Sequence, residues 1–181
     1  MKHPIHTPAA SRVLQTHSVL PTDTNALGML FGGRLVEWID VAAGIACQRH
    51  SRHRVVTASI DDLHFLQPIR VGMIVELLAQ VNATWRTSME AGVRIESEHP
   101  RTGKRVHACT AYLSYVAQDE EGHHLQIPQI VLENEDDKRR HLAAGERRAL
   151  RLSRSRMRRE QLDRHPARPI SPAADAKTED E

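Results

Sequence analysis

The segment from Thr22 to Asp40, TDTNALGMLFGGRLVEWID, contains the residues best suited to chemistry. A loop rich in Gly, Asp, Asn and Thr runs there directly into a predicted helix, with Gly32 and Gly33 at the junction. The first turn of a helix has N–H groups without internal partners and a partial positive charge, and glycine lets another group approach them. Such a junction suits a phosphate, a carboxylate or the oxyanion of an acyl-transfer reaction. A tight loop that only caps a helix is the alternative interpretation.

Asp40 lies within that helix, on a segment with almost no polar face. Because burying a carboxylate without partners is costly, Asp40 needs a hydrogen bond, a charge partner or a catalytic role. Ala43 and Gly44 are small enough to leave space beside the carboxylate. Asn25, in the preceding loop, offers an amide that could polarise a carbonyl, although Asn also commonly forms turns. From spacing alone, either residue could be structural or catalytic.

Hydrophobic periodicity predicts the elements that hold these residues. A helix is expected from Arg34 to about Arg49, apolar on nearly every face and therefore buried on most sides. A shift of the apolar phase predicts a bulge near Asp61 and Asp62, and the turn HPRTGKR predicts that consecutive strands pair antiparallel. We therefore expect an α+β fold in which an antiparallel sheet curls around one long helix. Period-two alternation places its five strands at residues 12–20, 55–65, 74–85, 89–97 and 105–117.

Composition favours one domain in the cytoplasm. The 181 residues are 27% charged and only 3% aromatic, so the core must be built mainly from Val, Ile, Leu and Ala. No apolar run approaches the roughly 20 residues of a membrane span, and the N-terminus lacks the apolar stretch of a signal peptide. Cys47 and Cys109 lie in apolar segments, which predicts reduced, structural thiols. The histidines show no metal-ligand spacing, so we expect no metal site.

Charge patterning divides the chain further. We expect a flexible N-terminus at 1–11, a folded domain at 12–132, a charged helical extension at 133–165 interrupted near Gly145, and a disordered tail at 166–181. Between Lys138 and Arg168, twelve basic residues accompany only three acidic ones. Such a segment could attract phosphates, anionic lipid or nucleic acid, and a solvated helix packed loosely on its oligomer is the simpler interpretation.

The order of several motifs resembles one known family. The runs TDTNALGMLFGGRLVEWIDVAAGIACQRH, VVTASIDDLHFLQPIRVG, RTSME and TGKR are similar to the hotdog-fold acyl-CoA thioesterases of the cytosolic acyl-CoA hydrolase type, over about residues 12–130. The resemblance implies a single hotdog domain with a five-stranded antiparallel sheet around a central helix. It also implies dimers joined edge to edge and further assembled as trimers of dimers. The implied reaction hydrolyses fatty acyl-CoA to fatty acid and coenzyme A, without a cofactor, a membrane span or a nucleic-acid partner.

The resemblance also implies roles for single residues. The family's loop asparagine falls on Asn25 and its helix aspartate on Asp40, and these two face each other across a subunit interface in the family. Arg86, Thr87 and Ser88 match a segment that the family places near bound coenzyme A. Two positions depart from the family pattern, with Trp85 in place of a usual glycine and Met73 in place of a common acid.

Residues and resemblance together lead to a mechanistic hypothesis. N–H groups near Gly32 and Gly33 would hold the thioester carbonyl oxygen, while Asn25 orients the carbonyl or the water. Asp40 would act either as general base on water or as a nucleophile that forms an anhydride. An alternative function is a non-catalytic acyl-CoA-binding regulator of the same fold. Retention of both Asn25 and Asp40 favours the enzyme, because a sensor needs neither a base nor a polarising amide.

Overall fold

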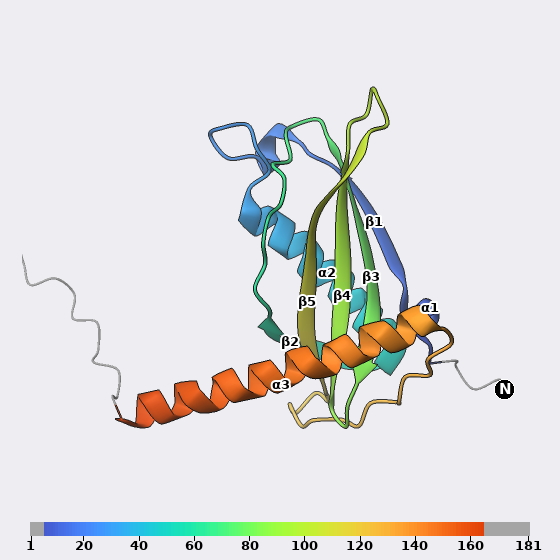
Figure 1. The fold of residues 1–181 in the computed structure, drawn as a ribbon, viewed down its shortest axis with the longest axis vertical. Coiled ribbons are helices and arrows are strands. Elements are labelled where there is room, and N and C mark those ends of the chain that lie inside the picture. The colour runs from blue at the N-terminus through green and yellow to red at the C-terminus, as the bar shows by residue number, and fades with distance from the viewer. Residues whose placement is uncertain (1–5, 165–181) are drawn as a thin grey trace, which may run out of the picture. The chain divides into compact units, whose positions relative to one another are not determined.

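The computed structural model describes residues 6–164, which divide at Gly145 into two compact units. In the first unit a five-stranded antiparallel sheet curls around helix α2, which runs behind the strands in Figure 1. This arrangement confirms the α+β hotdog fold. The predicted disordered tail, 166–181, and residues 1–5 of the predicted flexible N-terminus lie outside the described residues.

Helix α2 spans Gly32–Ser51 and confirms the predicted central helix, with Gly32 and Gly33 as its first two residues. Arg52 caps its C-terminal end, with a φ of 59° in the left-handed region and an N–H that donates to the Gln48 carbonyl at 2.8 Å. Its buried residues recur every three or four positions, as one broad apolar face requires. They are Leu35, Ile39, Ala42, Ala43, Ala46, Cys47, His50 and Ser51.

Five strands form, as predicted, and all but the second begin and end within two residues of their expected bounds. They are β1 (Val13–Ser18), β2 (Arg54–Ile60), β3 (Ile74–Thr84), β4 (Ser88–Glu98) and β5 (Arg105–Gln118). Their order in the sheet is β1-β3-β4-β5-β2, which leaves β1 and β2 at the two edges. Alternate residues of β3 face the core, as their periodicity predicts, among them Val75, Leu77, Ala79 and Val81.

Three expectations about β2 were wrong. The strand ends at Ile60 rather than at residue 65, and its bulge lies between Thr57 and Ser59 rather than near Asp61 and Asp62. It also pairs with β5 instead of with the next strand along the chain, β3. Turns of a few residues make hairpins of β3–β4 and β4–β5, whereas residues 61–73 form a long connection from edge strand β2 across the sheet to β3, which lies between β1 and β4.

The segment 125–131 closes one end of the sheet. The Ile127 N–H donates to the Arg86 carbonyl at 2.9 Å, and the Ile130 N–H donates to the Thr84 hydroxyl at 3.0 Å. The Val131 N–H donates to the His6 carbonyl at 2.7 Å. These bonds tie the end of β3 to the N-terminal segment, where Pro8–Ser11 form the short helix α1 with Pro8 and Ser11 buried.

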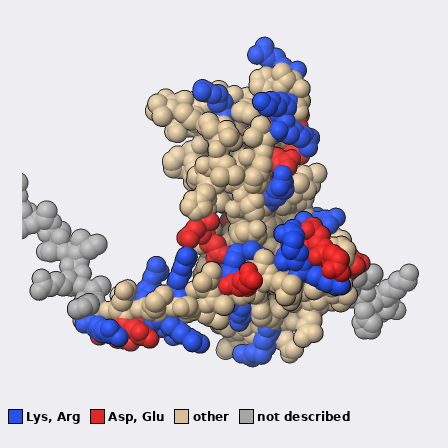
Figure 2. All heavy atoms as spheres, viewed as in Figure 1, with Lys and Arg blue, Asp and Glu red and all other residues tan. Residues whose placement is uncertain are grey.

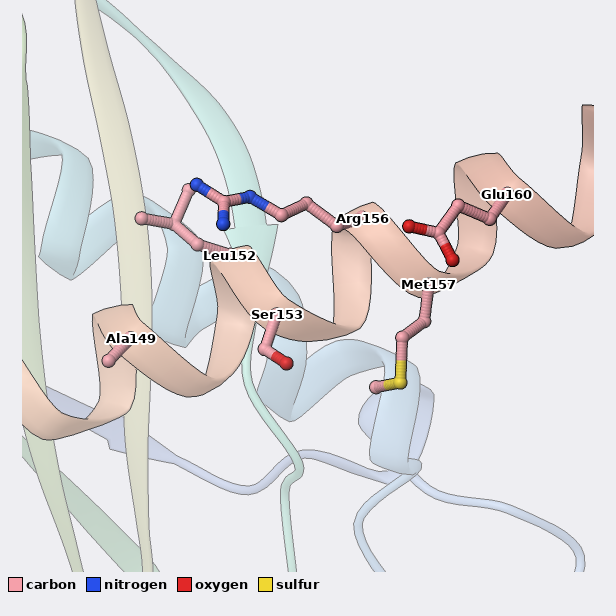
Figure 3. Close-up of a pocket in the computed structure, with 6 residues that line it drawn as sticks. All are labelled: Ala149, Leu152, Ser153, Arg156, Met157 and Glu160. Carbon is pink, nitrogen blue, oxygen red and sulfur yellow. The ribbon is translucent and has the colours of Figure 1, made fainter.

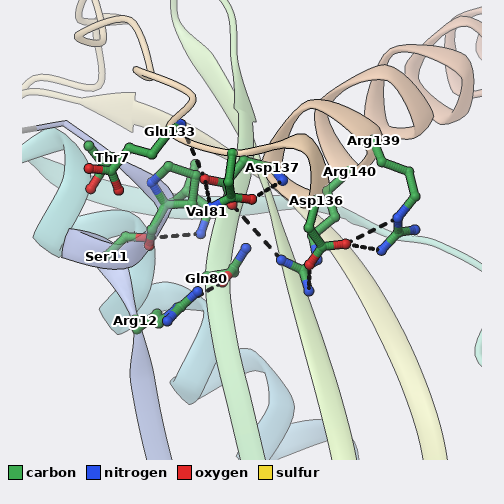
Figure 4. A network of polar contacts seen from close by, with 12 residues as sticks. Thr7, Ser11, Arg12, Gln80, Val81, Glu133, Asp136, Asp137, Arg139 and Arg140 are labelled. Atoms are coloured by element: carbon green, nitrogen blue, oxygen red, sulfur yellow. Dashed lines mark hydrogen bonds and ion pairs between the residues drawn. The ribbon is translucent and has the colours of Figure 1, made fainter.

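The charged extension is helical, as predicted, and forms α3 from Glu135 to Arg164. The expected interruption near Gly145 was wrong, because the helix continues through it. Asn134 caps the first turn by accepting the Asp137 N–H at 2.9 Å, and Asp137 is buried in the first unit. Figure 4 shows the ion pairs of this turn, including Arg139 and Arg140 on Asp136 at 2.6 Å each.

The second unit begins inside α3, at Gly145. Figure 2 shows basic side chains gathered along this helix. Figure 3 shows the side chains that line a pocket on this helix. They are Ala149, Leu152, Ser153, Arg156, Met157 and Glu160. Over residues 6–164, no helix is both long and apolar enough to cross a membrane.

Candidate active site

Asp40 lies half-buried in the third turn of α2 and is held by two hydroxyl groups. Thr57 Oγ1 and Tyr115 Oη each donate to Asp40 Oδ1 at 2.7 Å. Tyr115 Oη also lies 2.8 Å from the backbone carbonyl oxygen of Asp40. The hydrogen bonds that an aspartate on an apolar helix requires are therefore present.

Sheet register brings the two hydroxyls together. Thr57 on β2 is the direct partner of Tyr115 on β5, and the β2 bulge follows immediately after Thr57. Tyr115 is only 2% exposed, and its ring packs against α2 at Gly44, where an added Cβ would lie 3.7 Å from Cε1. The space that Gly44 was expected to leave beside Asp40 is thus occupied by Tyr115.

Sequence reasoning missed both hydroxyl residues. A signal for Tyr115 was available, because it is the one hydroxyl in the inward-facing row of β5, which is otherwise Cys109, Ala111, Leu113 and Ala117. For Thr57 no such signal exists, since a threonine on a strand is ordinary.

The first turn of α2 has no side-chain cap. The Leu35 N–H donates to the Phe31 carbonyl at 3.2 Å, so the N–H groups of Gly32 and Gly33 precede the first bond of the helix. Two aromatic rings lie against the glycines: a Cβ on Gly33 would meet Phe31 Cε1 at 2.6 Å, and one on Gly32 would meet Phe65 at 3.6 Å. Glycine at position 33 therefore preserves close approach between the Phe31 ring and the helix backbone.

Asp23 fixes the loop against this helix end. Its Oδ1 pairs with Arg34 Nε at 3.2 Å, and its Oδ2 accepts the Leu20 N–H at 3.0 Å. The Asp23 carbonyl accepts the Phe31 N–H at 2.8 Å. Asp23 is 9% exposed, so these bonds form in a largely buried setting, and they fix where the helix N-terminus points.

Asn25 is exposed and stabilises the loop. Its Oδ1 accepts the N–H groups of Leu27 at 2.9 Å and Met29 at 3.2 Å, so its turn-forming role is realised. The amide nitrogen is the group that can still donate outward. Within residues 6–164 no hydrogen bond joins Asn25 to Asp40, which is eight residues, or about 12 Å of helix, beyond Gly32.

Arg86 and Thr87 lie in the turn from β3 to β4, and Ser88 is the first residue of β4. The Thr87 carbonyl accepts the Ala117 N–H at 3.2 Å, and the Ser88 carbonyl accepts the Trp85 N–H at 2.8 Å. Arg86 is exposed, while the Trp85 ring next to it is half-buried. The backbone of this turn is fixed, and the Arg86 guanidinium is accessible to an anion.

Several known proteins with similar sequences are named thioesterases or thioester hydrolases. A sequence model of the thioesterase superfamily matches residues 27–104. The uncharacterized acyl-CoA thioester hydrolase YkhA of Bacillus subtilis is 40% identical over 146 residues, which are 81% of this chain and 85% of that protein. The chain belongs to the thioesterase superfamily. The resemblance seen in the sequence motifs is thereby confirmed.

Solved structures similar to this thioesterase agree in fold. The acyl-CoA hydrolase of Staphylococcus aureus, solved with butyryl coenzyme A, coenzyme A and coenzyme A disulfide, has a TM-score of 0.82 at 32% identity. The match covers 88% of this chain and 98% of that one. A hexameric acyl-CoA thioesterase has a TM-score of 0.79 at 40% identity, over 82% of this chain and 96% of that one.

Some relatives of the thioesterase are much longer. The human cytosolic acyl coenzyme A thioester hydrolase is 35% identical over 126 residues, which are 68% of this chain but only 33% of that protein. The matching region is therefore one part of the human protein.

Both thiols of the thioesterase are poor nucleophiles. Cys47 and Cys109 are free and buried, as predicted. Burial raises the pKa of Cys47 well above its ordinary value, and the nearby charge of Asp40 raises it further. Burial also raises the pKa of Cys109 to about 11. Both sulfurs are therefore protonated at neutral pH, which supports the structural role expected of them.

One exposed turn gathers potential metal ligands. Ligand atoms of Asp119, Glu121 and His123 lie within 4.8 Å of one another, at the end of β5. His123 already contacts Asp119 at 3.1 Å through its side chain and at 2.7 Å through its N–H. The contacts within the cluster account for its geometry, and no other feature of the turn points to a ligand.

Proposed function

We propose that this thioesterase hydrolyses fatty acyl-CoA to a free fatty acid and coenzyme A. The observation that carries this proposal is the Asp40 carboxylate on α2, whose Oδ1 accepts hydrogen bonds from the hydroxyls of Thr57 and Tyr115. The same helix begins with two glycines and has no side-chain cap. Relatives named as acyl-CoA hydrolases support the substrate class. A binding-only regulator would not need this carboxylate, so the enzyme is the better supported of the two functions.

Hydrolysis replaces the C–S bond with a C–O bond from water. The N–H groups near Gly32 and Gly33 would hold the carbonyl oxygen as it gains negative charge, with the Asn25 amide orienting the carbonyl or the water. Asp40 would take a proton from the attacking water, and the coenzyme A thiolate would leave. The alternative route is attack by Asp40 itself to form an anhydride, which water then cleaves.

We propose that the site is completed by a second copy of the chain. Within residues 6–164 no hydrogen bond joins Asn25 to Asp40, and β2 is an edge strand with Val56 45% and Ile60 42% exposed. Exposed apolar edge strands favour pairing with another strand. The proposed dimer joins two sheets edge to edge and assembles further as a trimer of dimers. Hexameric structural relatives support this assembly.

The remaining features fit a small-molecule substrate. We propose that Arg86 contacts coenzyme A phosphate, with Thr87 and Ser88 beside it, and that the reaction uses no cofactor and no metal. We propose no nucleic-acid partner. The name of the human cytosolic relative supports a cytoplasmic location.

The test is thiol release from acyl-CoAs of increasing chain length. The enzyme should release free thiol with turnover, and the chain-length profile should show a maximum. Binding of acyl-CoA without thiol release, by a folded and oligomeric protein, would instead assign the chain as a regulator.

A further inference from the structure

We propose that Tyr115 is a positioning residue that makes Oδ2 of Asp40 the base and stays bonded when Asp40 accepts its proton. This inference rests on the proposed role of Asp40 in the thioesterase reaction. Three observations carry it: the bonding of the two carboxylate oxygens, the pair of acceptors at the Tyr115 hydroxyl, and the fixed setting of the ring.

The two oxygens of the Asp40 carboxylate differ in their bonding. Oδ1 accepts from both Thr57 and Tyr115 at 2.7 Å. Across residues 6–164 no hydrogen bond reaches Oδ2. An oxygen that already accepts two hydrogen bonds is less basic than its neighbour, because the donors stabilise its negative charge. The proton from water should therefore go to Oδ2.

The Tyr115 hydroxyl has one proton and two acceptors. Asp40 Oδ1 lies at 2.7 Å and the Asp40 carbonyl oxygen at 2.8 Å, and one O–H can serve fully only one of them. While the carboxylate is ionised, the charge-assisted bond to Oδ1 is the stronger. Once Oδ2 is protonated, Oδ1 loses most of its charge, and the carbonyl becomes the competitive acceptor at nearly the same distance. The hydroxyl thus rotates between two partners without movement of the ring.

The ring is held in place and remains a proton donor. Tyr115 is 2% exposed, is paired with Thr57 across the sheet, and packs on α2 at Gly44. Burial, assisted by the hydrogen bond to Asp40, raises the pKa of the Tyr115 phenol far above its ordinary value, although the neighbouring Thr57 hydroxyl opposes this. The phenol is therefore protonated at neutral pH.

The first test removes only the hydroxyl. Tyr115→Phe keeps the ring and should lower kcat about tenfold while KM changes less than about twofold. A hydrogen bond to the ionised form of a carboxyl group lowers the pKa of that group by roughly 1 to 2 units. Loss of the Tyr115 hydroxyl should therefore move the acidic limb of the kcat–pH profile to higher pH, by about 1 unit. Tyr112→Phe, on the same strand but on the opposite face, is the matched control and should keep the wild-type limb.

A second variant makes the test independent of how well Tyr115→Phe folds. The chain has two tyrosines, so in a Tyr112→Phe background Tyr115 is the only one. Incorporating 3-fluorotyrosine there strengthens the hydroxyl as a donor, and the acidic limb should move to lower pH. Displacement of the limb in opposite directions by Phe and by fluorotyrosine is a result that a merely structural role would not give.

The outcomes distinguish a failure of the Tyr115 proposal from a failure of the proposed role of Asp40, on which it rests. If Asp40→Asn abolishes turnover but both Tyr115 changes leave the acidic limb at its wild-type pH, the positioning role is overturned and Asp40 keeps its function. If Asp40→Asn retains wild-type turnover, the proposed function of Asp40 fails first.

Discussion

Thr57 and Tyr115 stand opposite each other on β2 and β5, and their hydroxyl oxygens both lie 2.7 Å from Oδ1 of Asp40. The carboxylate therefore connects helix α2 to an edge strand and to the strand next to it. A change in any of these elements alters the setting of the proposed base.

Replacing Asp40 with Asn should leave the fold and coenzyme A binding intact, because the amide oxygen can still accept from both hydroxyls. It should lower kcat by at least about 100-fold, since an amide is not a base at neutral pH. Steady-state thiol release measures the effect. Glu120→Gln, which removes a surface carboxylate with 77% exposed side chain, is the control and should keep full turnover. Near wild-type turnover in Asp40→Asn would remove Asp40 from the mechanism.

Mixed oligomers test whether the site is shared. Asn25→Ala and Asp40→Asn subunits should each be inactive alone, and refolding them together should restore part of the activity, because some interfaces then pair an intact Asn25 with an intact Asp40. Mass spectrometry of differently tagged subunits would verify mixing. Mixed oligomers without any recovery would place both residues in one subunit's site.

Two glycines should respond to alanine in opposite directions. At Gly92 a Cβ would lie 2.5 Å from Asn82 Nδ2, and Asn82 is 3% exposed and hydrogen-bonded to Glu90 at 3.5 Å. Gly92→Ala should therefore lower the free energy of unfolding by about 1 to 3 kcal/mol. At Gly44 the nearest atoms would be 3.7 and 3.8 Å away, so Gly44→Ala should raise it by up to about 1 kcal/mol. Denaturant titrations measure the change in the free energy of unfolding for each variant. Changes of the same sign in Gly92→Ala and Gly44→Ala would contradict the packing described at these two glycines.

Acid should destabilise the fold through His50, which is 2% exposed at the end of α2. Burial lowers the pKa of His50 from the ordinary value of 6.5, and the neighbouring His6 lowers it further. The hydrogen bond to the Pro128 carbonyl at 3.0 Å has the opposite effect and raises this pKa. A lowered pKa means that the fold favours neutral His50, so its contribution to stability is complete above about pH 6.5 and is lost as the pH falls.

The measurement is the denaturation midpoint between about pH 7.5 and pH 5.5. His50→Gln retains a donor for the Pro128 carbonyl and should flatten the loss of stability over this range. His53→Gln, at an exposed position, should leave the loss as steep as in the wild type. Equal slopes in all three proteins would show that His50 does not titrate in this way.

Two truncations should differ in stability. Ending the chain after Ala144 removes only the second unit, and the catalytic residues should keep their kcat. Ending it after Leu132 also removes Asp137 and Ala144, which are 2% and 0% exposed, and should lower the thermal midpoint. Equal midpoints would show that the start of α3 stabilises nothing.

Loss of the basic helix should raise KM, if it attracts the phosphates of coenzyme A. That rise should become smaller as salt is added, because the Debye length is about 8 Å at physiological ionic strength.

The sequence predicted the fold well where periodicity reports burial. Buried residues of helix α2 recur every three or four positions, and those of strands β3, β4 and β5 alternate over most of each strand, because each element has one face against the core. Strand β2 was misjudged because Leu63 and Phe65 continue an apolar pattern outside regular structure, where Phe65 packs beside Gly32. Local pattern cannot distinguish a residue that packs on a strand from one that packs on a helix end.

The site was predictable only in part, for a related reason. Asp40 was conspicuous because its surroundings on the helix are apolar. Thr57 and Tyr115 reach it through strand register, and a pairing between residues 58 positions apart depends on the whole sheet. Such long-range relationships are set by topology, and the wrong expectation that β2 would pair with β3 concealed them.

Thr57 lies on β2, whose outer backbone edge is available for pairing with another copy. In the proposed assembly the same strand would join the subunits and hold the base, so dissociation would disturb catalysis as well as shape. Turnover per chain should then climb with enzyme concentration until the oligomer is saturated. Below that saturating concentration, halving the amount of protein would remove more than half of the hydrolytic flux, so expression level would act there as a nonlinear control on acyl-CoA breakdown.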